Sequence, residues 1–411
     1  MPFVSVFTPS HDPKFLDDAY DSLVAQSYEN WEWIVVLNGG AEWSKPNDER
    51  VWVHQSDLTG IGALKREAIA ASEGKVLVEL DHDDILMDDA LEEIVRAFDN
   101  HPEASLVYGD TSQMDVSKKP NHDLFDLTNG WKYTERSDGF LHTHSFAPLP
   151  SNVSYIWYAP NHPRAFLRAV YEAVGGYDAN LDVLDDQDLM NRLYQRGPFV
   201  HLPKVLYKQR IHADNTQRDP DKNLRIQEGT VDLYDQNIQP NALAWAKREN
   251  LLAIDLGAAH NPAYGYKTLD KQGVADYLCD VTEGLPFPDN SVGVIRAVDF
   301  LEHIPDKVFL MNEIHRVLAH GGMLLSLTPS TDGRGAFQDP THVAFWNENS
   351  FWYFTDENYA RFVPEITARF KVSKLETYYP NDWHERHKIS YVCANLVAIK
   401  DGPRIAGKDY I

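Results

Sequence analysis

The chain has 411 residues and a formal net charge of -24, from 62 acidic and 38 basic side chains. This length exceeds the roughly 100 to 200 residues of a single domain and predicts two or three domains. The acidic charge argues against nucleic acid or anionic lipid as a general partner, because phosphate groups are held mainly by Lys and Arg. No apolar run approaches the roughly 20 residues that cross a bilayer, so no transmembrane segment is expected.

The start of the chain and its two cysteines indicate the compartment. Residues 1–9 run straight into a strand pattern and lack the basic start and long apolar stretch of a secretion signal, which predicts a cytoplasmic location. Cys279 and Cys393 each lie near the end of an expected strand and are predicted to be reduced, packed thiols. Two cysteines provide no zinc or disulfide framework.

In the first half, strand-like and helical runs alternate, which predicts an α/β fold with a parallel sheet covered by helices. The expected strands are Phe3–Thr8, Trp33–Leu37, Val51–His54 and Val76–Leu80, and the expected helices are Phe15–Gln26 and Ala63–Ser72. A helical pattern at Leu224–Tyr234 is followed by an expected connector at Asp235–Pro240. We therefore place the boundary near Pro240, with domains at 1–240 and 241–411.

Carboxylates follow the fourth expected strand. Asp81 and Asp83 are two residues apart, so under the two-residue period of a strand they point to the same side. They can share one divalent cation, which would neutralise charge on the departing diphosphate of a sugar nucleotide. The alternative is a solvated acidic turn that caps the next helix, with Asp84 preceding Ile85.

Several segments of the first half together resemble glycosyltransferase family 2, which has the GT-A fold. The resemblance spans most of residues 1–217 and rests on Val4–Ser10, Glu32–Gly40 (EWIVVLNGG), Gly60–Lys65, Leu80–Asp84 (LDHDD), Gly175–Asp178 and Asp185–Leu189. It implies transfer of a sugar from a nucleotide-diphosphate donor to a glycan or other hydroxyl acceptor, with Mn²⁺ or Mg²⁺ as cofactor.

The same resemblance implies roles for individual residues. The residues expected to bind the donor nucleotide are Thr8, Pro9, Asn38, Lys65 and Asp81, with Asn38 at the base edge. The expected metal ligands are Asp83, Asp81 and His212, the last within Tyr207–Asn215 (YKQRIHADN).

An inverting displacement needs a general base at the acceptor hydroxyl, and the resemblance assigns this role to Asp186, preceded by Asp185. Capping of a helix N-terminus is the alternative role for these two residues. Trp131, Trp157 and His162 either line the acceptor groove or belong to the core.

The second half shows seven expected strands with interleaved helices, which suits a complete nucleotide-binding domain. The strands are Leu251–Asp255, Lys267–Asp270, Tyr277–Cys279, Val292–Ala297, Met323–Thr328, Val372–Tyr378 and Tyr391–Ile399.

Over roughly Asn241–Lys400, this half resembles a class I methyltransferase that uses S-adenosylmethionine (SAM), with a Rossmann-like, seven-stranded fold. The segments concerned are Asp255–Pro262 (DLGAAHNP), Leu285–Ser291 (LPFPDNS), Leu301–Ile304 (LEHI), Arg316–Leu318 and Gly321–Gly322. The resemblance implies a cofactor turn at Asp255 and Gly257, a ribose contact at Asp270 and an adenine contact at Asp280. A generic dinucleotide domain is the alternative, but the G-x-G-x-x-G pattern is absent.

His303 and His342 are the candidates for a base that assists methyl transfer to a hydroxyl, or else they are structural. Together the two halves predict a bifunctional enzyme that transfers a sugar and O-methylates the glycan product. Two alternatives stay open. In one, the methyltransferase-like half is a non-catalytic docking module; in the other, the sugar and methyl groups go to nucleic acid or protein.

Overall fold

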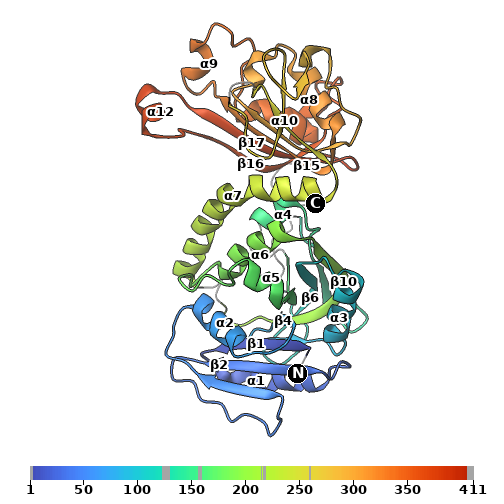
Figure 1. The fold of residues 1–411 in the computed structure, drawn as a ribbon, viewed down its shortest axis with the longest axis vertical. Helices are drawn as coiled ribbons and strands as arrows, with labels where there is room; N and C mark the ends of the chain where they lie inside the picture. The colour runs from blue at the N-terminus through green and yellow to red at the C-terminus, as the bar shows by residue number, and fades with distance from the viewer. Residues whose placement is uncertain are drawn as a thin grey trace. The chain divides into compact units, whose positions relative to one another are not determined.

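The computed structural model describes residues 3–122, 130–155, 160–213, 215, 219–258 and 261–404. Trp157 and Ala259 lie outside these residues. The chain forms two compact units, the first ending at Asn237 and the second beginning at Ile238 (Figure 1). Each unit is an α/β structure with its own sheet and its own hydrophobic core.

The first unit is built on a 10-stranded sheet with the order β3-β2-β1-β4-β9-β6-β10-β5, in which β8 adds to β6 and β7 adds to β8. Its strands are β1 (Val4–Ser10), β2 (Trp31–Leu37), β3 (Val51–Gln55), β4 (Val76–Glu79), β5 (Ile85–Leu86), β6 (Leu106–Met114), β7 (Lys132–Glu135), β8 (Leu141–His144), β9 (Arg164–Leu167) and β10 (Phe199–Arg210).

Strands β1 to β4 are parallel and match the four expected strands, with ends that differ by one or two residues. Strand β2 is buried along its whole length, as expected for a strand covered on both faces. Because β2 lies on one side of β1 and β4 on the other, the carboxyl ends of β1 and β4 flank a switch point, where open α/β sheets bind ligands. The first turns after both strands therefore open into the same crevice.

The helices of the first unit begin with the two that the sequence predicted, α1 (Leu16–Val24) and α2 (Ile61–Ala70). The others are α3 (Ala90–Asn100), α4 (Pro150–Tyr155), α5 (Arg168–Ala173) and α6 (Asp185–Arg196). Helix α3 buries the apolar stripe Ala90, Leu91, Ile94, Ala97 and Phe98, whose three- and four-residue spacing is that of one helix face.

The second unit is built on a seven-stranded sheet with the order β13-β12-β11-β14-β15-β17-β16, and the seven predicted strands are all present. They are β11 (Leu252–Leu256), β12 (Lys267–Asp270), β13 (Tyr277–Leu278), β14 (Val292–Val298), β15 (Leu318–Pro329), β16 (Phe370–Tyr378) and β17 (Tyr391–Ala398). Only β17 runs antiparallel to its neighbours. Strand β11 has β12 on one side and β14 on the other, so its carboxyl end marks the second switch point.

The helices of the second unit include α8 (Lys307–Val317), α9 (Gly335–Gln338), α10 (Glu348–Thr355), α11 (Glu357–Ala360) and α12 (Asp382–His387). No helix within the described part of the chain is long and apolar enough to cross a membrane.

The expected connector at Asp235–Pro240 is wrong, because one helix, α7 (Pro220–Arg248), runs through it with Pro240 inside. The buried side chains Tyr234, Ile238, Ala242 and Trp245 continue one apolar stripe at helical spacing across the proline. Burial of this stripe offsets the hydrogen bond that the proline removes, a cost of roughly 3 kcal/mol in a helix interior.

Candidate functional sites

A cleft of about 500 Å³ lies at the switch point of the first sheet. Its walls come from the end of β1, the loop after β2, the start of α2, the turn after β4, the start of β9, the segment that leads into α6, the end of β10 with the segment after it, and the start of α7. The lining residues predicted from the sequence are Pro9, Asn38, Lys65, Asp81, Asp83, His162, Asp185, Asp186 and His212. The fold thus brings together residues that lie far apart in the sequence.

Two predicted metal ligands are in direct contact. His212 Nε2 lies 2.8 Å from Asp83 Oδ2, and the Asn215 amide donates to the same oxygen over 3.5 Å. Burial raises the pKa of Asp83, but the hydrogen bond with His212 and the nearby charges of His82 and His212 together outweigh burial, and the pKa is lowered. The side chain of Asp81 is 44% exposed towards the cleft. Two carboxylates and an imidazole form a donor set that suits Mg²⁺ or Mn²⁺.

Asp84 also lines the cleft, but its carboxylate is held by the fold. It is buried, and its Oδ1 accepts a hydrogen bond of 2.6 Å from the backbone N–H of Arg210. This hydrogen bond ties the turn after β4 to β10. Burial raises the pKa of Asp84 well above the usual value. The alternative of a helix-capping turn is wrong, since β5 follows Asp84 and α3 begins only at Ala90, after its N-cap Asp89.

Glu79, which the sequence analysis missed, joins the two sides of the cleft from beneath. It lies two residues before Asp81 at the end of β4 and is buried. Its Oε1 forms an ion pair with Lys65, and its Oε2 lies 3.4 Å from Arg164 Nη1 and 3.6 Å from His162 Nε2. The same period-two spacing that pairs Asp81 with Asp83 could have indicated this residue.

The two cations that hold Glu79 also hold the acidic pair at the start of α6. Lys65 Nζ lies 2.8 Å from Asp185 Oδ2, and Arg164 Nη1 lies 2.6 Å from Asp186 Oδ2. Burial opposes the charge on Lys65 and on Glu79, but attraction to opposite charges prevails. Asp185 and Glu79 raise the pKa of Lys65 well above its usual value, and Lys65, His162 and Arg164 lower the pKa of Glu79. At Asp185 burial wins and raises the pKa to about 6.

Backbone geometry also positions this pair. Leu184, immediately before α6, adopts a left-handed conformation with φ 61°, which is costly for a bulky side chain. Gly229 of α7 makes room for it, because a Cβ at that position would lie 2.7 Å from Leu184 Cδ1. Asp185 and Asp186 then occupy the first turn of α6, where the helix dipole favours negative charge.

Two predicted donor-binding residues are committed to the fold. Thr8 is buried outside the cleft lining; its hydroxyl donates to the Leu80 carbonyl over 2.7 Å and accepts from the Trp33 indole over 2.9 Å. Lys65 reaches the cleft wall, but its ammonium group is engaged by Glu79 and Asp185. From the sequence, the Thr8 hydroxyl at a strand end and the Lys65 ammonium group on a helix both suit a ligand contact. The structure shows that each has buried partners within the protein.

The predicted acceptor residues separate in the structure. His162 lines the cleft, where its ring stacks on Tyr207 with 5.0 Å between centroids. Trp131 is buried against Phe146 and is not part of the cleft lining.

In the second unit, Asp255 is completely buried at the end of β11. Its two carboxylate oxygens accept hydrogen bonds of 2.9 and 3.1 Å from Arg296 Nη1, and the backbone N–H of Ala263 donates to Oδ2 over 3.0 Å. Gly257 follows with φ 73°, and a Cβ there would lie 2.5 Å from Phe300 Cδ2. Asp255 therefore fixes the loop, and the left-handed backbone of Gly257 packs against Phe300 where a Cβ would not fit.

The other two predicted cofactor residues follow neighbouring strands at the same edge of the sheet. Asp270 ends β12, and its Oδ1 accepts from the Gln272 N–H over 3.1 Å. Asp280 follows β13 and accepts from the N–H and hydroxyl of Thr282 at 3.1 and 2.7 Å. Lys271 also pairs with Asp280 over 2.5 Å and, as the main cause, lowers its pKa to about 2.

The two candidate histidines of the second unit meet at a residue that the sequence analysis passed over, Glu302. Ligand atoms of Glu302, His303 and His342 all lie within 4.8 Å of one another. Glu302 is buried, neither of its carboxylate oxygens has a hydrogen-bond partner, and burial raises its pKa to about 7. A buried carboxylate without partners is costly and marks a functional candidate.

The histidines differ in their surroundings. His342 Nδ1 lies 3.1 Å from the Ala336 carbonyl, which fixes the proton on that nitrogen in the neutral ring, and Nε2 faces Glu302 over 3.9 Å. His303 is exposed, with Nδ1 3.2 Å from the Thr341 carbonyl. Next to this cluster, an open hollow of about 600 Å³ is lined by 305–308 and 343–345.

Both units are thus nucleotide-binding α/β folds with acidic sites at their switch points, and comparison with known families defines them further. Residues 5–154 match the model of glycosyl transferase family 2, and residues 236–326 match a methyltransferase domain. The chain joins a family 2 glycosyltransferase segment to a methyltransferase domain, both from families of transferase enzymes. The match supports the methyltransferase prediction over a generic dinucleotide domain.

Relatives with curated names include the chondroitin synthase and the hyaluronan synthase of Pasteurella multocida, each 24% identical over 224 residues. The match covers 53% of this chain but 21% of each relative, so the chain spans about a fifth of their length. The crystal structure of S. aureus TarS 1-349 is 15% identical, covers 64% of this chain and 76% of that chain, and has a TM-score of 0.41. A likeness of that degree carries no conclusion about ligands.

The buried ion pairs generate a stability prediction. Lys65→Met removes the cation that Glu79 and Asp185 share, and we expect the free energy of unfolding to fall by about 3 to 5 kcal/mol. Chemical denaturation of the whole chain measures this change. The loss should shrink below pH 6, because Asp185, with a pKa of about 6, then becomes neutral.

Lys204→Met is the matched control, because Lys204 also pairs with two carboxylates, Asp89 and Glu93, but at the surface. Its loss should cost less than about 1 kcal/mol. Equal losses for the two variants would contradict the structural role of Lys65.

Proposed function

We propose that the chain is a bifunctional enzyme. Its first unit transfers a sugar from a nucleotide-diphosphate donor to a hydroxyl of a glycan or similar acceptor, in a metal-dependent, inverting reaction. Its second unit uses SAM to O-methylate the glycan product. The observation that carries the proposal is the cleft in which Asp81, Asp83 and His212 lie together with Asp186.

The residues of the first unit divide the work. Asp81, Asp83 and His212 would hold the divalent cation, which, when bound, neutralises charge on the leaving diphosphate. Pro9 and Asn38 line the cleft for the donor nucleotide. Asp186 removes the proton of the acceptor hydroxyl as the sugar bond forms. Arg164 holds Asp186 in place, and Lys65 and Glu79 are assigned positioning roles beneath the cleft.

The residues of the second unit are arranged for cofactor binding at one edge of the sheet. Gly257 forms the cradle, Asp270 is placed for the ribose hydroxyls and Asp280 for the adenine amino group, and SAM, when bound, supplies the methyl group. Glu302, with His342 beside it, is the candidate base for the acceptor hydroxyl, since a pKa of about 7 suits proton transfer near neutral pH.

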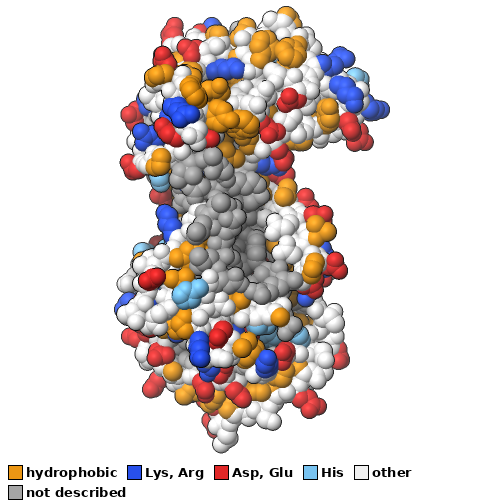
Figure 2. Space-filling model, turned by 180° about the vertical axis from the view of Figure 1, so that it is seen from behind, with side chains coloured by type: hydrophobic (Ala, Val, Ile, Leu, Met, Phe, Trp, Pro, Cys, Tyr) orange, Lys and Arg blue, Asp and Glu red, His pale blue; other side chains and the backbone are white. Residues whose placement is uncertain are grey.

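The surface charge supports a glycan acceptor over nucleic acid. On the face shown in Figure 2, Lys and Arg side chains of the described residues stand singly or in small groups among acidic ones. A strand of nucleic acid would need a continuous basic path.

The first test concerns the base. Asp186→Asn keeps a polar side chain of equal size, so we expect donor binding to persist while sugar transfer falls by about 10²- to 10⁴-fold. Asp83→Ala should instead abolish Mn²⁺-dependent turnover of the sugar nucleotide. Mass spectrometry of sugar nucleotides incubated with glycan acceptors, with donor binding measured by calorimetry, separates the two effects.

Asp188→Asn is the control for this test, because Asp188 lies in the same helical turn but pairs with Arg192 outside the cleft lining. Its activity should match that of the wild type. Undiminished transfer by Asp186→Asn would reject the base assignment.

A second candidate function is that the methyltransferase-like unit only docks partners. One observation favours it: both carboxylate oxygens of Asp255 are hydrogen-bonded by Arg296 and Ala263, so this acidic residue has a structural role. Calorimetry with SAM distinguishes the two functions. If the unit is active, the wild type binds SAM. The Gly257→Ala variant should lose SAM binding, because the added methyl group collides with Phe300 and the backbone at this position is left-handed.

Gly402→Ala is the matched control, since Gly402 has a similar φ of 84° but no atom within 4 Å of the added Cβ. It should bind SAM normally. Absence of SAM binding by the wild type, or binding unchanged by both Gly257→Ala and Asp270→Ala, would favour docking.

The ionisation of Glu302 gives a pH prediction. As a base it must be unprotonated, so methyl transfer should rise as the pH increases through about 7, and Glu302→Gln should lose this rise. The folded-state pKa lies above the usual 4.5, so ionisation costs stability: relative to Glu302→Gln, the wild type should lose stability as the pH rises from about 4.5 to about 7, with no further change above about 7. Rate profiles and thermal unfolding at matched pH check both parts; a pH-independent difference would contradict the assignment.

A further inference from the structure

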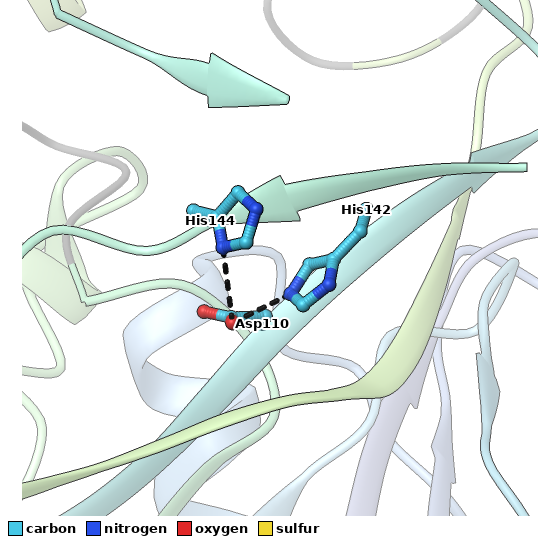
Figure 3. Close-up of side chains that lie close together, drawn as sticks. All are labelled: Asp110, His142 and His144. Atoms are coloured by element: carbon cyan, nitrogen blue, oxygen red, sulfur yellow. Dashed lines mark hydrogen bonds and ion pairs between the residues drawn. The ribbon is translucent and has the colours of Figure 1, made fainter. Parts of the chain in front are cut away.

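Outside the cleft, three histidines surround one buried carboxylate of the first unit. Asp110 on β6 is completely buried, His142 and His144 lie on β8, and His201 lies on β10. None of these residues lines the cleft that holds Asp83. Figure 3 shows the two β8 rings directed at the same carboxylate.

The strand pairing explains why these side chains meet. His142 and His144 are two residues apart on one strand, so they project from the same face. Thr143 between them pairs with Thr111 of β6, which places the neighbouring Asp110 on that same face. Strand β10 pairs with the other edge of β6 and adds His201.

The distances suit one shared ion. Asp110 Oδ2 lies 2.7 Å from His142 Nε2 and 3.8 Å from His144 Nδ1, and one atom from each residue falls within a 4.8 Å group. Ligands at about 2.0 to 2.1 Å from a tetrahedral ion stand about 3.3 Å apart. The two measured separations bracket this value.

Surrounding groups hold the ligands in these orientations. Asp110 Oδ1 lies 2.7 Å from His201 Nε2 and accepts from the Ser145 N–H over 2.8 Å, which leaves Oδ2 directed at the two β8 histidines. The opposite nitrogen of His144, Nε2, lies 2.6 Å from the Thr134 hydroxyl on β7. Hydrogen bonds of this kind, from outer residues to ligands, are typical of metal sites in proteins.

The chemistry of the group favours a zinc-like ion. The His142 and His144 side chains are 18% and 36% exposed, so an ion can reach them from solvent. Two imidazoles and one carboxylate, with a fourth position for water, form a ligand set that suits Zn²⁺.

We propose that Asp110, His142 and His144 bind a divalent ion of the zinc class, separate from the cation of sugar transfer. His201 and Thr134 are positioning residues. The ion would fasten the β7–β8 hairpin to the central sheet, which β8 meets at one residue pair in the described structure, Thr111 with Thr143.

The test uses the full chain, stripped of metal with a chelator and titrated with Zn²⁺ by calorimetry and with Co²⁺ by visible absorption. We expect one equivalent to bind with the absorption of a four-coordinate Co²⁺, and Zn²⁺ to raise the unfolding temperature. This equivalent should persist in Asp83→Ala and disappear in the double variant H142Q/H144Q. His201→Gln should keep the stoichiometry and weaken binding by about 10- to 100-fold.

The control double variant is H54Q/H101Q, which removes two exposed histidines away from the cluster and should bind like the wild type. Wild type that takes up no Zn²⁺, or H142Q/H144Q that keeps the four-coordinate spectrum, would overturn the proposal. If H142Q/H144Q fails to fold, X-ray absorption of zinc-loaded wild type decides: imidazole and carboxylate ligands support the site, and a shell without imidazole rejects it.

Discussion

The cleft of the first unit depends on one buried carboxylate, that of Glu79. Lys65 and Arg164 both lie against it, and each reaches onward to one member of the acidic pair at the start of α6. A buried charge is tolerated only when it is paired, so removing any member would leave its partners uncompensated. The turn after β4 and the N-terminus of α6 are therefore held in one arrangement, although they are distant in the sequence.

Much of the fold could be predicted from the sequence, because buried strands and turn residues carry local signals. The four parallel strands of the first sheet and all seven of the second are present, and the acidic turn after β4 lies in the cleft. Strands β5 to β10 were not predicted from the sequence, although site residues that follow some of them were. Their pairing combines parallel and antiparallel neighbours that no local pattern reveals.

The differences between expectation and structure have a common physical origin, which is that partners are set by tertiary contacts. Thr8 and Lys65 have the chemistry of ligand contacts, but buried neighbours use it. Glu79 and Glu302 show the reverse case. Each lies beside residues predicted to be functional but was not itself predicted, and its burial in the structure marks it as a candidate. At Pro240 a strong local signal for a break was overridden by the apolar stripe of α7.

Leu184, with its left-handed backbone, lies between the acidic pair and Gly229, a residue outside the cleft lining. Leu184 keeps its conformation beside Gly229, where a side chain would collide with it. A side chain at position 229 would thus first displace the Leu184 side chain, and tolerance of any residue there would depend on which residue stands at 184. The two positions should behave as an epistatic pair, so that a replacement harmful in one sequence background becomes neutral in another.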